Sequence, residues 1–395
     1  GIIPSELGNL MQLTRLHLLT NKLSGTIPSE LGKVTQIKVL YLWGNALTGT
    51  IPSELGKLTE MVEFSLCINQ LNGSIPSEFG NLMQLPFLSL WNNSLSGTIP
   101  SELGQLTKMT DLELANNQLN GTIPSELGDL VQLTTLYLWN NRLSGTIPSE
   151  LGKLTQMMDL ELSNNQLNGT LPSELGNFVQ LVTLYMDINN LSGTIPSELG
   201  RLTRLKNLGL SENLIFGTIP SELGKLTQMM DLELQRNQLN GTIPSELGNA
   251  VQLATLFMDV NNLSGTIPSE LGRLTQLTDL HLSINQLNGT IPSELGYLMQ
   301  LGQLSLDDNM LSGAIVSELG NLTNMAVLYL ENNLLSGAGP LELDFLPNLS
   351  LVNVSGNSQL FGNVSFLCDT GNRTVYIDDT ISSLSCSCCN IDFFW

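Results

Sequence analysis

The sequence is poor in the residues that catalysis and nucleic-acid binding use most. It has only two histidines, His17 and His281, and only 15 lysines and arginines against 36 acids, which gives a net charge of −21. An acidic balance disfavours nucleic acid, whose phosphates attract basic surfaces. No serine or cysteine nucleophile accompanies either histidine in a catalytic arrangement. We therefore expect no enzyme, no catalytic residue, no cofactor and no nucleic-acid partner.

Long apolar runs are also absent. No stretch approaches the roughly 18 residues that a membrane-spanning helix needs. We therefore expect no membrane span within this chain.

Cysteine is scarce outside the C-terminal end of the chain. Four of the five cysteines, Cys368, Cys386, Cys388 and Cys389, lie close together there, and four cysteines allow three pairings. A bridge from Cys386 to Cys388, or from Cys388 to Cys389, would be strained, so Cys368 is expected to pair with one of that group. Local pairing or a bridge to another chain is open to the other two. A zinc site is a weaker interpretation because no histidine lies nearby, and we expect no metal site. The fifth, Cys67, is expected to be exposed on a strand face.

What the sequence does contain is one unit of 24 residues, repeated. An asparagine recurs at this spacing from Asn21 to Asn357, fifteen times without a gap. The unit reads L-T-x-L-x-x-L-x-L-x-x-N-x-L-x-G-T-I-P-S-E-L-G-x, and residues 274–297 match every fixed position. A single unit cannot bury its leucines, but stacked units can.

The unit around Leu136 shows how each repeat is expected to fold. Leu136 and Leu138 alternate with polar residues, which predicts a short strand with both leucines pointing inward. Asn141 is expected to end the strand and to bond backbone groups of the turn, so that the asparagines form an internal ladder. Gly145 allows an unusual backbone angle, and Ile147 returns to the core.

The end of the unit predicts a short helical turn. Pro148 can start such a turn, because its missing N–H costs nothing there. Glu150 is expected near the positive end of the turn and Gly152 at its terminus.

The repeated L-x-x-L-x-L-x-x-N-x-L-x-G-x-I-P order resembles the plant-type extracellular leucine-rich repeat. Receptor-kinase ectodomains and polygalacturonase-inhibiting proteins are similar in repeat. The resemblance implies an α/β solenoid: a right-handed superhelix of about 15 repeats of 24 residues, with a parallel β-sheet on its concave face.

The departures from the pattern predict two parts. Residues 1–362 form the solenoid, which starts in mid-repeat without an N-terminal cap, and residues 363–395 form a cysteine-containing C-terminal cap. The regular array is expected to stop because Val316 replaces the proline of the repeat and Gln359 is inserted before Leu360. The chain is expected to be part of something longer.

Two polar columns follow the repeat. One glutamate per repeat, from Glu6 to Glu342, supplies fifteen of the acids, and a base three places later, such as Lys33, is expected to pair with its own glutamate. A face for divalent cations or for a basic partner is the alternative. The second column is threonine, for example Thr122, which predicts a short second strand with threonine outward and isoleucine inward. Ice binding through this column is a minor alternative.

Many glycosylation signals predict a secreted or cell-surface glycoprotein. Thirteen Asn-x-Ser/Thr sequons occur, five of them beside the glycine of the turn: Asn72, Asn92, Asn120, Asn168, Asn190, Asn240, Asn262, Asn288, Asn321, Asn348, Asn353, Asn363 and Asn372.

The outward strand positions are the expected ligand-binding surface. Some carry aromatic rings or acids with a second period of 48 residues, so that alternate repeats differ. The candidates are Tyr41, Trp43, Trp91, Asp111, Glu113, Tyr137, Trp139, Asp159, Glu161, Tyr185, Asp187, Asp231 and Glu233. Rings beside carboxylates suit a protein hot spot or a polysaccharide. Retention of the aromatics for packing along the sheet after duplication of a 48-residue unit is the alternative.

These observations predict a secreted, N-glycosylated binding or scaffold protein that recognises a protein or glycan through the concave strand face. The alternative is a structural subunit of an extracellular fibre, coat or cell-wall assembly. The uniformity of the repeats, the spare Cys67 and the cysteine-rich end would serve self-association.

Overall fold

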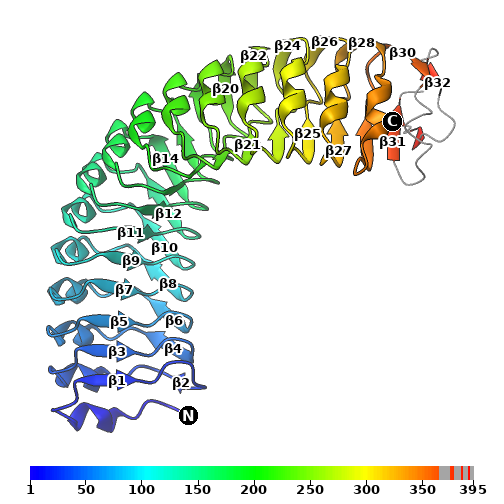
Figure 1. Cartoon of the computed structure of the whole chain (residues 1–395). Helices are drawn as coiled ribbons and strands as arrows, with labels where there is room; N and C mark the ends of the chain where they lie inside the picture. Colours follow the sequence, from blue (N-terminus) through cyan, green and yellow to red (C-terminus); the bar gives the residue numbers. More distant parts are fainter. Residues whose placement is uncertain (364–373, 378–383, 386–389, 392–395) are drawn as a thin grey trace. The chain divides into compact units, whose positions relative to one another are not determined.

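The computed structural model describes residues 1–363, 374–377, 384–385 and 390–391. The chain divides into two compact units, Gly1–Ser192 (unit 1) and Gly193–Trp395 (unit 2), which are described separately. Within each unit every repeat contributes a strand to a main parallel sheet, a strand to a second parallel sheet and a helical turn (Figure 1). The predicted leucine-rich-repeat solenoid is confirmed by this arrangement.

In unit 1, the main sheet pairs successive repeats in parallel, with each residue opposite the one 24 positions later. Its strands are β1 (Arg15–His17), β3 (Val39–Tyr41), β5 (Glu63–Ser65), β7 (Phe87–Ser89), β9 (Asp111–Glu113), β11 (Thr135–Tyr137), β13 (Asp159–Glu161) and β15 (Thr183–Tyr185). The second sheet contains β2 (Ser24–Gly25), β4 (Ala46–Thr50), β6 (Gln70–Gly73), β8 (Ser94–Gly97), β10 (Gln118–Gly121), β12 (Arg142–Gly145), β14 (Gln166–Thr170) and β16 (Asn190–Ser192).

Unit 2 repeats the same plan. Its main sheet contains β17 (Asn207–Gly209), β19 (Asp231–Glu233), β21 (Thr255–Phe257), β23 (Asp279–His281), β25 (Gln303–Ser305), β27 (Val327–Tyr329), β29 (Leu351–Asn353), β31 (Thr374–Ile377) and β33 (Asn390–Ile391). Its second sheet contains β18 (Phe216–Gly217), β20 (Gln238–Gly241), β22 (Asn262–Thr266), β24 (Gln286–Gly289), β26 (Met310–Gly313), β28 (Leu334–Ala338), β30 (Gln359–Asn363) and β32 (Leu384–Ser385). Parallel pairing therefore continues past residue 362, through β29–β31 and β30–β32.

The helical turns of the described residues are 3-10 helices of five residues each, closed by bonds between residues three apart, such as Leu151 N–H to the carbonyl oxygen of Pro148. In unit 1 they are η1 (Ser5–Asn9), η2 (Ser29–Lys33), η3 (Ser53–Lys57), η4 (Ser77–Asn81), η5 (Ser101–Gln105), η6 (Ser125–Asp129), η7 (Ser149–Lys153) and η8 (Ser173–Asn177). In unit 2 they are η9 (Ser197–Arg201), η10 (Ser221–Lys225), η11 (Ser245–Asn249), η12 (Ser269–Arg273), η13 (Ser293–Tyr297), η14 (Ser317–Asn321) and η15 (Leu341–Phe345). Among the described residues, none of these helices has the length and apolarity to cross a membrane.

The core follows the predicted pattern. Leu136, Leu138 and Leu143 are fully buried, and Ile147 is 3% exposed. Burying a leucine side chain stabilises a fold by about 2 kcal/mol, and the repeat buries several in every unit. Thr122 is exposed while Ile123 beside it is buried, as the alternation predicted, but the second strand of this repeat, β10, ends at Gly121, before both residues.

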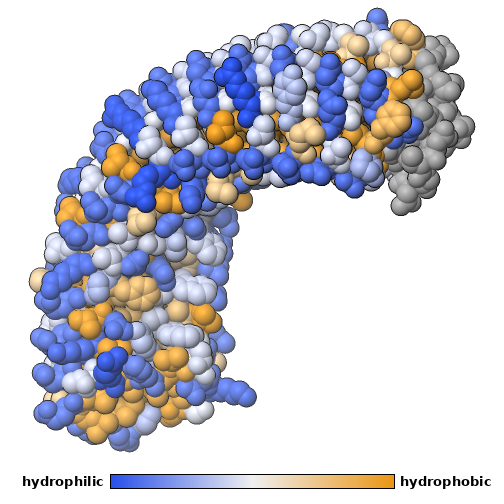
Figure 2. All heavy atoms as spheres, viewed as in Figure 1, coloured by the Kyte–Doolittle hydropathy of each residue, from blue (hydrophilic) through white to orange (hydrophobic). Residues whose placement is uncertain are grey.

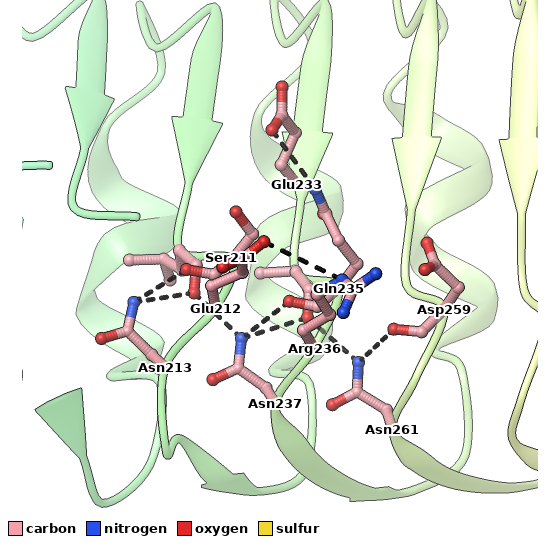
Figure 3. Close-up of polar contacts among 11 residues, drawn as sticks. Ser211, Glu212, Asn213, Glu233, Gln235, Arg236, Asn237, Asp259 and Asn261 are labelled. Carbon is pink, nitrogen blue, oxygen red and sulfur yellow. Dashed lines mark hydrogen bonds and ion pairs between the residues drawn. The ribbon is translucent and has the colours of Figure 1, made fainter. Parts of the chain in front are cut away.

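The asparagine ladder is confirmed. Asn237 donates from Nδ2 to the carbonyl oxygens of Leu234 and Gln235 in its own repeat, at 3.2 and 3.3 Å, and to that of Leu210 in the repeat before, at 2.9 Å (Figure 3). Its Oδ1 accepts the N–H of Ile215 at 3.0 Å. One side chain thus satisfies the turn and joins two repeats.

Two predictions about the helical turn are wrong. Gly152 does not terminate the helix, because η7 continues to Lys153. A Cβ atom at Gly152 would lie 2.5 Å from Cβ of Glu174, so this glycine lets adjacent helical turns stack closely. Lys153 pairs with Asp129 of the preceding repeat at 2.9 Å, and not with its own Glu150.

The residue before each ladder asparagine holds a left-handed backbone. Asn and Gly tolerate this conformation, and they occupy many of these positions, for example Asn140 with φ 54°. At Ile68, Ile188, Val260 and Ile284 a β-branched residue occupies it, with φ between 52° and 55°. Such residues are true outliers, so these four positions store backbone strain.

Relief of this strain is directly measurable. Ile284 is 50% exposed, so its replacement loses little core packing. We expect Ile284→Asn to raise the free energy of unfolding by about 1 kcal/mol in urea titrations. The control is Val251→Asn, which replaces another exposed β-branched residue whose φ is not positive. A gain of the same size in the control would show that strain is not the cause.

Candidate functional site: an acid–aromatic face on the main sheet of unit 1

The thirteen predicted binding residues all lie on the main sheets or directly after their strands, and all are half-buried. Eleven belong to unit 1, whereas Asp231 and Glu233 lie in β19 of unit 2. Unit 1 therefore contains the larger candidate surface. In Figure 2 its exposed surface intersperses hydrophobic and hydrophilic residues.

The acids and rings of unit 1 meet in one row. Glu113, Tyr137 and Glu161 are direct partners across β9, β11 and β13, and Asp111 and Asp159 flank Thr135 in the row beside them. Tyr185 follows Glu161 on β15. Acid pairs thus occur on β9 and β13, with a tyrosine on β11 between them and another on β15 beyond them. We call Asp111, Glu113, Tyr137, Trp139, Asp159 and Glu161 the acid–aromatic face.

Three tryptophans form a second row two residues further along each repeat. Backbone hydrogen bonds continue past the strands at this level: the N–H of Gly44 donates to Cys67, that of Ile68 to Trp91 and that of Asn92 to Ala115. The order across repeats is therefore Trp43, Cys67, Trp91, Ala115, Trp139. Tryptophan alternates with a small residue.

This alternation corrects the prediction for Cys67, which is 7% exposed instead of open on the strand face. Its Sγ lies 3.3 Å from Oγ of Ser65. Ala115 is likewise only 2% exposed. Both small residues lie between repeats that carry a tryptophan at the same level, and neighbouring strands are about 4.8 Å apart. The three tryptophans are themselves half-buried.

Burial and like charge govern the electrostatics of the acid–aromatic face. Desolvation raises the pKa of Glu113 and of Glu161, and the charges of Asp111 and Asp159 raise them further. Desolvation, together with all four carboxylates, raises the pKa of Tyr137 to about 12. The two ion pairs found among the described residues, Lys153–Asp129 and Arg236–Glu212, include none of these acids.

Unit 2 carries a second group of acids, which are not among the thirteen predicted binding residues. Backbone bonds place Asp259, Ser283, Asp307 and Glu331 in successive repeats of one row. Desolvation raises the pKa of Asp259 and of Asp307, and raises that of Glu331 from 4.5 to about 7. These acids were visible in the sequence as outward residues of the same row. Their partial burial was not, because it depends on neighbouring repeats.

The raised pKa of Glu331 predicts a pH-dependent stability. The folded state holds the proton more tightly than the unfolded state, so the contribution of this group is fully present below pH 4.5 and is lost as pH rises to about 7. We expect Glu331→Gln to flatten that part of the stability profile in urea titrations from pH 4 to 8. The control is Glu318→Gln, which removes an exposed carboxylate from η14. Profiles that flatten equally in both variants would contradict the assignment to Glu331.

An aromatic pair adjoins these acids. The rings of Phe257 and His281 stack with centroids 4.4 Å apart and planes inclined by 29°. Glycosylation candidates lie elsewhere: Asn72, Asn120, Asn168, Asn240 and Asn288 are exposed on the second sheets. The predicted cysteines Cys368, Cys386, Cys388 and Cys389, and the sequon at Asn372, lie outside the described residues.

Comparison with known proteins agrees with this architecture. The leucine rich repeat family model matches residues 131–191, and a single-repeat leucine rich repeat model matches 36–58, 84–106, 108–130, 204–226 and 276–298. No curated protein matches the chain.

Solved structures are closely similar. The plant peptide hormone receptor RGFR1, solved in complex with RGF2, is 35% identical with a TM-score of 0.85, over 99% of this chain and 70% of the receptor chain. The HAESA ectodomain of Arabidopsis, solved with an IDA peptide hormone, is 32% identical with a TM-score of 0.81, over 99% and 73%. The LRR protein LIC12759 of Leptospira interrogans is 32% identical with a TM-score of 0.70, over 90% and 87%. The chain belongs to the leucine-rich repeat family, and its structure is closely similar to those of plant receptor-kinase ectodomains.

Proposed function

We propose that this chain is an extracellular binding protein that recognises a protein or peptide through the main-sheet face of unit 1. The observation that carries the proposal is the arrangement of half-buried rings and carboxylates on one open sheet face, outside the leucine core. Aromatic residues that are partly buried and partly presented to solvent dominate the energetics of protein interfaces. RGFR1 and HAESA, which share the fold, were solved with peptide hormones.

Binding is favoured over catalysis. The acids lie in a periodic row on an open sheet face, and enzymes concentrate their acids in a pocket that separates the pKa values of neighbouring groups. The solved plant relatives are receptors.

The test is replacement of Trp43, Trp91 and Trp139 together by alanine. We expect peptides selected on the wild-type protein from a random display library to lose at least ten-fold in affinity, because the variant removes the three largest rings of the face. Calorimetry measures the affinity, and circular dichroism checks the fold, since the three rings are half-buried.

The matched control removes exposed apolar groups elsewhere in unit 1. Met83, Val131 and Val179 are 45–53% exposed and lie next to helical turns. Their joint replacement by alanine should leave affinity within two-fold. Undiminished affinity in the tryptophan variant would reject this face as the binding surface, and polysaccharides in the same panel test the glycan alternative.

Extracellular location is part of the proposal. Five sequons occupy one exposed column on the second sheets, where a glycan would project into water without contacting the main-sheet face. Peptide mapping of the native protein should find glycans in this column. Unmodified asparagine at Asn72, Asn120, Asn168, Asn240 and Asn288 would contradict secretion through a glycosylating pathway.

A fibre joined through Cys67 is not favoured, because a thiol that is 7% exposed is not available to another chain. The exposed threonine column provides the surface for the ice-binding alternative, but it is a single row and carries no ring or acid for a protein ligand.

A further inference from the structure

The spacing of the acid–aromatic face constrains the conformation of its ligand. Acid pairs stand on β9 and β13, with β11 between them. Two strand spacings amount to about 9.6 Å. A ligand that runs across these strands would therefore meet two pairs of carboxylates about 9.6 Å apart.

Of the regular peptide conformations, polyproline II matches this interval. It rises about 3.1 Å per residue with three residues per turn, so every third side chain points the same way at intervals of about 9.3 Å. Side chains on one side of an extended strand recur at about 6.8 Å, which does not match the spacing of about 9.6 Å between the two acid pairs. Side chains three or four apart on a helix lie about 5–6 Å from each other.

The negative charge of the face favours basic ligand side chains at the positions that point toward the sheet. Asp111, Glu113, Asp159 and Glu161 are half-buried carboxylates, and the ion pairs of the described residues leave them without a cation. The raised pKa values of Glu113 and Glu161 show that burial in the folded protein destabilises these two charges. A lysine or arginine between the two carboxylates of one strand would offset that cost, and a guanidinium matches carboxylates best.

The rings between the acid pairs complete the match. Tyr137 and Trp139 lie on the intervening repeat, beneath the stretch of ligand backbone between two inward-pointing side chains. Aromatic-lined surfaces bind polyproline II segments because proline packs flat on a ring and the ligand is already ordered.

We propose that the acid–aromatic face binds a cationic polyproline II segment of a partner protein, with arginine or lysine at every third position and the segment running across β9, β11 and β13. This inference rests on the proposed function of the same face and specifies its ligand.

The test compares two synthetic peptides of identical composition, (Pro-Pro-Arg)₄ and (Pro-Arg)₄-Pro₄, by fluorescence anisotropy with the full chain. Both favour polyproline II, but their arginines recur at about 9.3 Å and about 6.2 Å respectively. We expect the first to bind at least five-fold more tightly. Equal affinities, or no binding of either peptide, would overturn the proposal, and neither result depends on the folding of a variant.

A charge-matched pair of variants tests the location. The face variant carries Asp111→Asn, Glu113→Gln, Asp159→Asn and Glu161→Gln. The control variant carries Glu102→Gln, Glu126→Gln, Glu150→Gln and Glu174→Gln, which removes four exposed carboxylates from η5–η8. We expect the face variant to lose at least ten-fold for (Pro-Pro-Arg)₄ and the control to stay within two-fold. Equal losses would show general attraction by the acidic chain, which overturns the assigned site.

Failure of this inference is distinguishable from failure of the proposed function. Library peptides that depend on the three tryptophans but lack the three-residue spacing of basic residues would leave the function standing and reject the polyproline II ligand. The absence of any tryptophan-dependent binder would reject the function itself.

Discussion

Replacing Asn333 by alanine should lower the free energy of unfolding by about 3–5 kcal/mol. Asn333 is 4% exposed and donates from Nδ2 to the carbonyl oxygens of Leu306, Leu330 and Glu331, at 3.0, 3.2 and 3.1 Å. Its Oδ1 accepts the N–H of Leu311 at 2.9 Å. Alanine would leave these buried backbone groups without a partner, and each such group costs about 1–3 kcal/mol. Urea unfolding followed by circular dichroism measures the loss.

Asn21 supplies the control within the same ladder. It is exposed and bonds only the carbonyl oxygens of Leu18 and Leu19 in its own turn, at 3.1 and 3.0 Å. Asn21→Ala should cost about 1 kcal/mol or less, because water can solvate the groups that it releases. Similar losses in the two variants would mean that the ladder acts only within each turn and does not join repeats.

The ladder and the core could be predicted because both follow from one repeated pattern. Once Asn141 was placed at the end of a strand, every fixed position of the unit acquired an inward or outward direction, and burial of Leu136, Leu138 and Ile147 followed. The pairing between repeats could be predicted as well, because a parallel sheet sets each residue beside its equivalent 24 positions later.

The failures at Cys67 and Lys153 share one physical origin, which is contact with residues of adjacent repeats that differ from the repeat pattern. Cys67 occupies an outward position between repeats that carry Trp43 and Trp91 at the same level, and it is nevertheless only 7% exposed. Lys153 meets Asp129 because this acid lies one repeat earlier, at a position where most repeats have no acid. Patterns averaged over the repeat cannot show such pairs.

The candidate site divides in the same way. The alternation of acids and rings, from Asp111 to Tyr185, was visible in the sequence. The raised pKa values of Glu113 and Glu161 depend on how far neighbouring side chains cover each carboxylate, which only the packed structure shows. The close approach of adjacent helical turns at their glycines is likewise visible only in the packed structure.

Gly272→Ala should destabilise unit 2 by about 2–4 kcal/mol, because the added methyl group has no space. A Cβ atom at this position would lie 2.4 Å from the carbonyl oxygen of Glu294 and 2.8 Å from its carbonyl carbon. These are backbone atoms of the next helical turn, so no side-chain rotation can relieve the clash. The turns of η12 and η13 would have to separate, which strains the sheet pairing of the same repeats.

Gly302→Ala is the matched control in unit 2. There the nearest atoms to a new Cβ are the carbonyl oxygens of Thr278 at 3.6 Å and Asn324 at 4.0 Å, and the backbone does not need a positive φ. Alanine should therefore be neutral or stabilising by up to about 1 kcal/mol, because it reduces the freedom of the unfolded chain. Thermal and urea unfolding of both variants measure the difference. A Gly272→Ala protein as stable as Gly302→Ala would show that the helical turns can move apart freely, and that the glycine of the Ser-Glu-Leu-Gly segment is not what lets adjacent repeats stack closely.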